Sequence, residues 1–219
     1  STLGDLQKGW SVLPSDTAGR VEGGVAVRND WGVLCLSTAA STINLWSPPN
    51  PETAAPIELA VTDARGKPVG RLSSVEIEKR VGDRVVVKAS FGGGSAAAFV
   101  LSRTTPVIEV RPAEAFGRLR LRLRTKLALV PDRLADDLII RPALCSQPTS
   151  LLPAARLVAT PFGAGLLAVV TPADQQQVWL NPARDKEAFE GLDVAPAGKS
   201  VFLSVLTEGD LWHEAAPKR

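Results

Sequence analysis

Tyrosine and methionine are absent from this sequence of 219 residues, and histidine occurs only once. A single histidine cannot build a zinc site from several imidazoles, and the two cysteines lack the CxxC spacing that would replace them. No G-x-S-x-G segment accompanies the histidine, His213, so the sequence shows no serine-hydrolase motif. Any aromatic surface for a ligand must come from the five tryptophans and six phenylalanines.

Long apolar runs and a strong net charge are also missing. The longest wholly apolar stretch lies around residues 164–170, far short of the roughly 20 residues that a membrane-spanning helix needs. The net charge is +2 with a sequence pI near 8.7, which is too mild to indicate nucleic-acid binding. No charged segment followed by an apolar one opens the chain, as it would in a signal peptide. We therefore expect a soluble protein with no membrane span and no nucleic-acid partner, in a compartment that the sequence leaves open.

The two cysteines are far apart in the sequence. Cys35 lies within the apolar run 33–36, where a buried free thiol is a common occupant. We favour two inert thiols. A disulfide between Cys35 and Cys145 stays open, because sequence spacing alone does not fix cysteine pairing.

Short strands separated by turns dominate the sequence. Residues 24–36 contain two apolar runs around an Asn-Asp turn, which is the pattern of a β-hairpin. Similar segments follow at 42–46, 57–63, 75–78, 85–88, 96–102, 107–110, 116–124, 156–159, 165–170, 177–180 and 199–206. Sustained helical periodicity is lacking, and residues 185–192 have room for two helical turns at most. The pattern predicts an all-β fold, a large antiparallel β-sandwich with little helix, formed by residues 1–219 as a single domain.

The clearest pattern is a strict alternation of arginine and leucine over residues 118–124, which predicts a strand with leucines toward the core. The opposite face then carries an arginine ladder, formed by Arg118, Arg120, Arg122 and Arg124. Guanidinium groups about 6–7 Å apart suit the carboxylates or sulfates of a polyanionic glycan. The alternative is neutralisation by a neighbouring strand, for which Glu76 and Glu78 are the candidates. We favour neutralisation, which makes the ladder an ordinary solvated face.

The best polar cluster is an acidic loop that contains Asp132, Asp136 and Asp137. Three interpretations stay open for it. Short carboxylates often bind backbone amides in turns, and this is the interpretation we favour. The loop is otherwise a calcium site, since calcium takes hard oxygen ligands, or it contains a general acid or base. We expect no cofactor, with calcium as the alternative.

The tryptophans are candidates for stacking on sugar rings, although in β-sandwiches they more often anchor the core. Trp46 precedes a proline-rich segment at 48–51, which predicts a surface loop because proline cannot donate to a β-ladder. We therefore expect Trp46 to be the most exposed tryptophan and a candidate ligand-binding residue.

The hairpin rhythm of segments 81–87, 99–103 and 106–110 resembles that of a known class of domain. It is similar to the super-sandwich, or galactose mutarotase-like, β-domains of many polysaccharide lyases and glycoside hydrolases, over roughly residues 57–125. The resemblance implies a large β-sandwich associated with carbohydrate processing. It carries over no catalytic residues, because the mutarotases use several catalytic histidines with a glutamate and this chain has one histidine.

These patterns favour a non-catalytic β-sandwich module associated with carbohydrate processing or protein assembly, with a glycan or another protein domain as its partner. The first alternative is a carbohydrate-active enzyme, a lyase or hydrolase, that uses Asp132, Asp136 or Asp137. The second is a structural, oligomer-forming protein whose sheet edges meet other chains.

Overall fold

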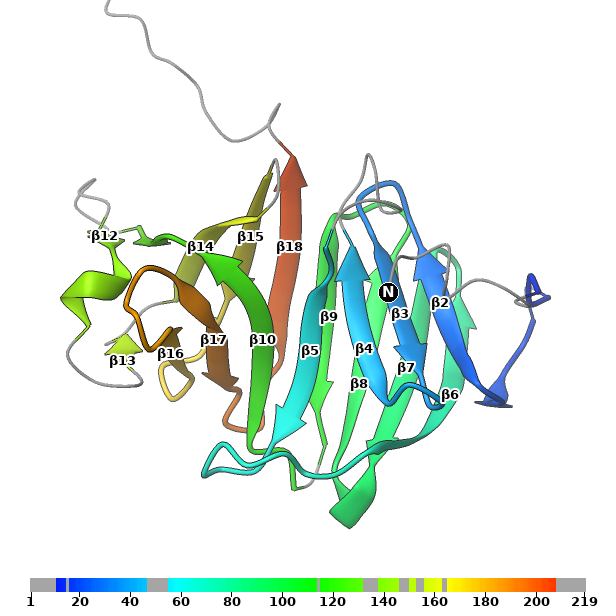
Figure 1. Cartoon of the computed structure of the whole chain (residues 1–219). Coiled ribbons are helices and arrows are strands. Elements are labelled where there is room, and N and C mark those ends of the chain that lie inside the picture. The colour runs from blue at the N-terminus through cyan, green and yellow to red at the C-terminus, as the bar shows by residue number, and fades with distance from the viewer. Residues whose placement is uncertain are drawn as a thin grey trace, which may run out of the picture.

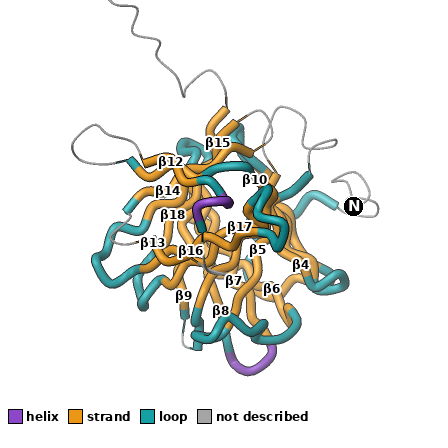
Figure 2. The backbone as a smooth tube through the Cα atoms, turned by 60° about the vertical axis from the view of Figure 1, so that its left-hand side comes forward, coloured by secondary structure: helices purple, strands orange, loops and turns teal. Residues whose placement is uncertain are grey.

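The computed structural model describes residues 11–14, 16–46, 55–113, 115–131, 138–145, 150–152, 156–162 and 165–207. In these residues the chain forms two sheets whose strand pairs are antiparallel, so the predicted all-β sandwich is confirmed. Helical geometry in the same residues is limited to two short 3-10 turns, Gly92–Gly94 and Pro142–Leu144. Figure 2 shows that strands and loops make up almost all of the described chain.

The first sheet has ten strands in the order β1-β6-β7-β8-β9-β18-β15-β14-β11-β12. Its strands are β1 (Gly19–Val21), β6 (Leu72–Val81), β7 (Arg84–Phe91), β8 (Ala96–Ser102), β9 (Val107–Pro112), β18 (Val201–Thr207), β15 (Gly165–Val170), β14 (Leu157–Phe162), β11 (Ala128–Val130) and β12 (Leu138–Ile140). The run from β6 to β9 is a meander of sequential hairpins. The predicted hairpin around residues 81–84 is confirmed, with Val81 paired to Arg84.

The second sheet has eight strands in the order β13-β16-β17-β10-β5-β4-β3-β2. Its strands are β13 (Ser150–Leu152), β16 (Gln177–Pro182), β17 (Phe189–Ala195), β10 (Arg118–Thr125), β5 (Ile57–Thr62), β4 (Thr42–Trp46), β3 (Val33–Ser37) and β2 (Gly24–Arg28). Figure 1 shows β5, β4 and β3 in front of β9, β8 and β7, which belong to the other sheet. The predicted hairpin of residues 24–36 is confirmed as β2 and β3.

The core lies between the two sheets. A single cluster of buried apolar side chains draws on both of them, with Leu59, Leu119 and Leu121 from the eight-stranded sheet and Phe99 and Leu203 from the ten-stranded one. Their burial follows the alternation of each strand, because side chains of period two point to one face. The single domain expected for residues 1–219 stays a prediction. The described residues include no helix long and apolar enough to cross a bilayer.

Residues 185–192 stay within the limit of two helical turns at most that the sequence sets. Residues 185–192 do not form the helical turns for which they have room, because the chain enters β17 at Phe189 and pairs with β10 and β16. Gly191 makes this pairing feasible. Its φ is +149°, and a Cβ on it would lie 2.0 Å from the carbonyl oxygen of Leu121. Only glycine fits so close an approach.

Candidate functional site

The arginine ladder lies on the outer face of the eight-stranded sheet. The leucines of β10 point into the core, where Leu119 and Leu121 are completely buried and Leu123 is 6% exposed. The arginines therefore point away from the core, as the alternation predicts. β10 lies between β17 and β5, so these two strands decide what the arginines contact.

Three of the four ladder arginines form ion pairs. Arg120 pairs with Asp193 of β17 at 2.7 Å, and Arg122 pairs with Glu58 of β5 at 2.8 Å. Arg124 reaches Asp185 at 4.0 Å, with both side chains more than half exposed. Neutralisation thus occurs, but the expectation that glutamates 76 and 78 provide it is wrong. They belong to β6, which lies in the other sheet.

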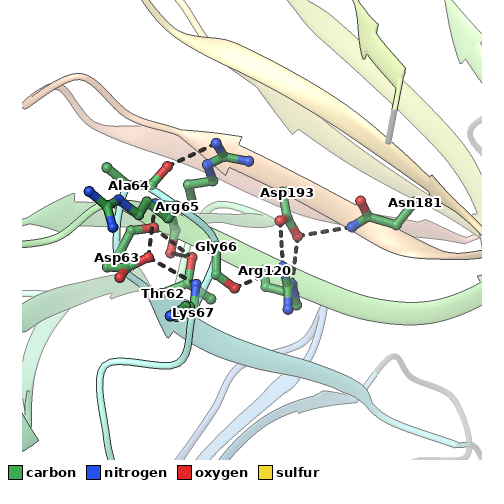
Figure 3. A network of polar contacts seen from close by, with 10 residues as sticks. Thr62, Asp63, Ala64, Arg65, Gly66, Lys67, Arg120, Asn181 and Asp193 are labelled. Atoms are coloured by element: carbon green, nitrogen blue, oxygen red, sulfur yellow. Dashed lines mark hydrogen bonds and ion pairs between the residues drawn. The ribbon is translucent and has the colours of Figure 1, made fainter. Parts of the chain in front are cut away.

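The pair of Arg120 and Asp193 is the rigid centre of this face (Figure 3). The Arg120 guanidinium donates through Nε and Nη2 to the two carboxylate oxygens of Asp193, at 2.8 and 2.7 Å. Asn181 Nδ2 donates to the same carboxylate at 2.9 Å. The Asp193 side chain is only 1% exposed, and its hydrogen bonds raise the pKa of Arg120. A bidentate, largely desolvated pair of this kind holds both side chains in one geometry.

A tight loop, residues 63–67, stands beside this centre, and Figure 3 shows its Gly66 next to Arg120. Asp63 Oδ1 accepts hydrogen bonds from the backbone N–H groups of Arg65 and Lys67, at 2.8 and 2.9 Å. The hydrogen bond from Lys67 is the main reason that the pKa of Asp63 is lowered. Arg120 Nη2 also donates to the carbonyl oxygen of Gly66 at 3.3 Å. The loop is thereby fixed from inside and from the ladder.

Gly117 lets the loop approach the start of β10. A Cβ at Gly117 would lie 2.1 Å from the backbone carbon of Asp63, so any larger residue would push the loop away. The N–H of Gly117 donates to the carbonyl of Thr62 at 3.0 Å. This contact fixes the loop relative to the first arginine of the ladder.

Arg118 differs from the other three arginines because it has no carboxylate partner among the residues that the structure describes. Its Nη2 donates to the backbone carbonyl of Ala64 at 2.9 Å. Its guanidinium carbon lies 4.0 Å from the centre of the Trp179 ring, a cation–π contact. Trp179 is half-buried and directly opposite Asp193 in the register of β16 and β17. Together these residues form the Arg118 corner: Arg118, Trp179 and the 63–67 loop.

Sequence reasoning singled out the ladder but not its partners. Trp179 and Asn181 lie two residues apart on β16, so period two places them on the same face as Asp193. The alternation of side chains along residues 177–182 is the sequence signal that places Trp179 and Asn181 on one face. Nothing in the sequence indicates that Asp193 lies beside Arg120, since the pairing joins strands that are 73 residues apart.

The expectation of an exposed Trp46 is wrong. Its side chain is completely buried, on the far half of the same sheet. It packs with Val33 and Cys35 in a second apolar cluster, separate from the core between the sheets. Burial raises the pKa of the Cys35 thiol to about 11. Cys35 and Cys145 are both buried free thiols, so they do not form the disulfide that the sequence left open.

The acidic loop, Asp132, Asp136 and Asp137, lies outside the described residues, as does His213. The calcium site and the catalytic role considered for the loop therefore stay predictions. Within the described part of the chain, no group of three histidine, cysteine, aspartate or glutamate side chains is placed to hold a metal.

A hollow of about 530 Å³ lies where the β2–β3 turn meets the ends of β7 and β8. Its polar groups already serve the fold. Asn29 Nδ2 donates to the carbonyl of Ser102 at 2.9 Å, which ties one sheet to the other. The hydroxyls of Ser102 and Thr104 donate to the Asp83 carboxylate at 2.5 and 2.6 Å, and the bond from Ser102 is the main cause of the lowered pKa of Asp83. The polar groups that line the hollow thus connect the two sheets. The ladder face is therefore the better candidate for a ligand-binding site.

Comparison with known proteins gives a likeness in structure only. No family model matches the chain, and no curated protein matches its sequence. Among solved structures, it is similar to a glycoside hydrolase family 81 chain from Clostridium thermocellum, with a TM-score of 0.54 and 8% sequence identity. The match covers 90% of this chain and 25% of that one. At this identity the likeness shows the fold alone, and this chain spans about a quarter of the glycoside hydrolase chain.

Proposed function

We propose that this chain is a non-catalytic β-sandwich module that binds saccharide on the ladder face, within a carbohydrate-processing system. Two observations support the proposal. Its fold is similar to a quarter of a glycoside hydrolase chain, and its ladder face combines a half-buried tryptophan with fixed polar groups. We further propose that the β-sandwich is of the super-sandwich class, as the hairpin rhythm of the sequence predicts.

The observation that carries the proposal is the fixed network of Arg120, Asp193 and Asn181 beside Trp179. Sugar sites combine an apolar surface with a few polar groups in set positions, because the hydroxyls of a saccharide need partners in defined directions. Rigid side chains lose little entropy on binding, so a preorganised network favours affinity. Along this sheet face, the stacked pair of Trp179 and Arg118 supplies the flat surface, and the network holds the partly exposed Arg120 guanidinium in a set position.

The same contacts favour binding over hydrolysis. Glycoside hydrolysis requires one carboxyl group that gives a proton and one that acts as base or nucleophile. Both oxygens of Asp193 accept hydrogen bonds from Arg120, and Glu58 is paired with Arg122. The Asp193 carboxylate is therefore not free to act as acid or base toward a substrate. This supports a binding role for the described part of the face.

Affinity electrophoresis through gels that contain soluble polysaccharides tests the proposal. We expect at least one polysaccharide to retard the wild-type chain, and Trp179→Ala to remove the retardation. Trp31→Ala is the matched control, since Trp31 is also half-buried but follows β2, at the other edge of the sheet. Failure of a broad polysaccharide panel to retard the wild type would overturn the proposal.

A second measurement separates the binding module from the enzyme. The wild-type chain is incubated with each retarding polysaccharide, and new reducing ends and unsaturated products are measured. We expect none above a heat-denatured control. Product formation that disappears in Asp132→Asn, Asp136→Asn or Asp137→Asn would establish the enzyme instead.

A further inference from the structure

Among the residues that the structure describes, the positive charge of the ladder lacks a carboxylate partner at one end only. Arg120, Arg122 and Arg124 each have a carboxylate partner, whereas Arg118 contacts a backbone carbonyl and an aromatic ring. The charge of Arg118 is therefore still available to a ligand, although its side chain is held in place on two sides.

The 63–67 loop adds two cations to the same corner. Arg65 and Lys67 are exposed, and both interact electrostatically with the carboxylate of Asp63 in the same loop. Their backbone N–H groups are fixed by Asp63, and the carbonyl of Ala64 between them accepts the hydrogen bond from Arg118. Figure 3 shows Arg65 and Lys67 projecting from the loop that lies along the ladder. Three cations thus share this corner with one carboxylate, that of Asp63.

The position of Arg118 also decides what Trp179 offers. A neutral sugar stacks on the face of an aromatic ring, but the guanidinium of Arg118 already lies over this ring at 4.0 Å. A ligand that approaches this ring therefore meets the planar cation as well. A guanidinium with free N–H groups binds carboxylate, sulfate or phosphate oxygens better than neutral hydroxyls, because the hydrogen bonds are charge-assisted.

We infer that the Arg118 corner selects an acidic saccharide, one whose carboxylate or sulfate groups bind Arg118, with Arg65 and Lys67 attracting the same polyanion. The inference rests on the proposed function and names the ligand class of its site. Carboxylate and sulfate groups both present anionic oxygens on a sugar chain. The experiment separates the two.

The test compares matched charged and neutral polymers. Dextran sulfate is paired with dextran, and polygalacturonate with its methyl ester, each titrated against the wild-type chain at low salt. We expect the charged member of at least one pair to bind at least about tenfold more tightly, and added salt to weaken the binding through screening. The pair that shows the difference identifies sulfate or carboxylate.

Matched variants assign the effect to the corner. Arg118→Gln is expected to weaken binding of the charged polymer by about tenfold, the loss of a charge-assisted contact. Arg124→Gln removes the same charge from the same strand but leaves the corner intact, so its affinity should stay within about twofold of wild type. The double variant Arg65→Gln/Lys67→Gln alters only exposed side chains, and it keeps the test valid if Arg118→Gln does not fold.

The outcomes separate the two proposals. If neutral polymers bind as tightly as charged ones, the acidic-saccharide inference is overturned while saccharide binding stands. If no polysaccharide binds, both are overturned. If single-stranded DNA of equal charge binds as tightly as the acidic polysaccharide, the corner attracts polyanions in general and the inference is overturned as well.

Discussion

The outer face of the eight-stranded sheet carries charged side chains on β5, β10 and β17, and apolar ones on β3 and at the end of β4. In β10, burial alternates from residue to residue, whereas all five residues of β3 are buried. The difference has a physical cause. Alternation appears where one face of a strand meets solvent, and it disappears where both faces are covered.

The two halves are also stabilised differently. The apolar half gains from removing Val33, Cys35 and Trp46 from water. The charged half must offset the desolvation of Asp193, which it does through bonds from Arg120 and Asn181. Substitutions in the charged half should therefore range from large effects at buried pairs to small effects at exposed ones.

The largest effect is expected for Asp193→Ala, about 3–5 kcal/mol of unfolding free energy, because it leaves Arg120 partly buried without its partner. Urea denaturation measures it. The control is the double variant Asp193→Leu/Arg120→Met, which removes both charges and should recover much of the loss. A loss below about 1 kcal/mol for Asp193→Ala would show that this pair behaves like an exposed one.

Leu121→Ala should cost roughly 2–5 kcal/mol through lost burial and a residual cavity. Leu121 is completely buried under the ladder, so this variant measures the core beneath the charged half. The same substitution at Leu138, which is 57% exposed, is the control and should stay within about 0.5 kcal/mol. Equal losses at the two positions would contradict the inward direction of the β10 leucines.

Local patterns predicted the ladder and most of the strands because those features depend on period two and on turn residues. The hairpin of β2 and β3 and the alternation of β10 are examples. Trp46 was predicted to be exposed from the prolines that follow it, but burial depends on what packs against the outer face. No local pattern encodes that.

Long-range pairing explains the other differences. Glu76 and Glu78 alternate as the partners of a ladder should, yet the topology places β6 in the other sheet. Asp193 follows a segment with room for helical turns, and its role appears only when Gly191 lets β17 approach β10. The arginines of the candidate site could therefore be predicted from their spacing. Their partners could be found only from the fold.

Cys35→Ser tests the apolar half of the sheet. It should lower the free energy of unfolding by about 1–3 kcal/mol, because it buries a hydroxyl among apolar side chains. Cys35→Ala is the control, because it removes the sulfur without adding a polar group. In the native protein the Cys35 thiol should react slowly with a thiol reagent at pH 8, because its pKa of about 11 keeps it protonated. Rapid reaction without unfolding would contradict the burial of this half.

The smallest effect is expected at the exposed pair of Arg122 and Glu58. The two residues are directly opposite each other on β10 and β5, with side chains 48% and 39% exposed and a contact of 2.8 Å. Arg122→Gln should cost less than about 1 kcal/mol, because water screens the pair and both side chains lose freedom in making it. A double-mutant cycle with Glu58→Gln isolates the coupling, which we expect to be about 0.2–1 kcal/mol at low salt and smaller at high salt. A coupling above about 2 kcal/mol would place this pair with Arg120 and Asp193. Strong coupling would then extend from Arg120 to Arg122 and end at the exposed pair of Arg124 and Asp185 on one side and at the Arg118 corner on the other.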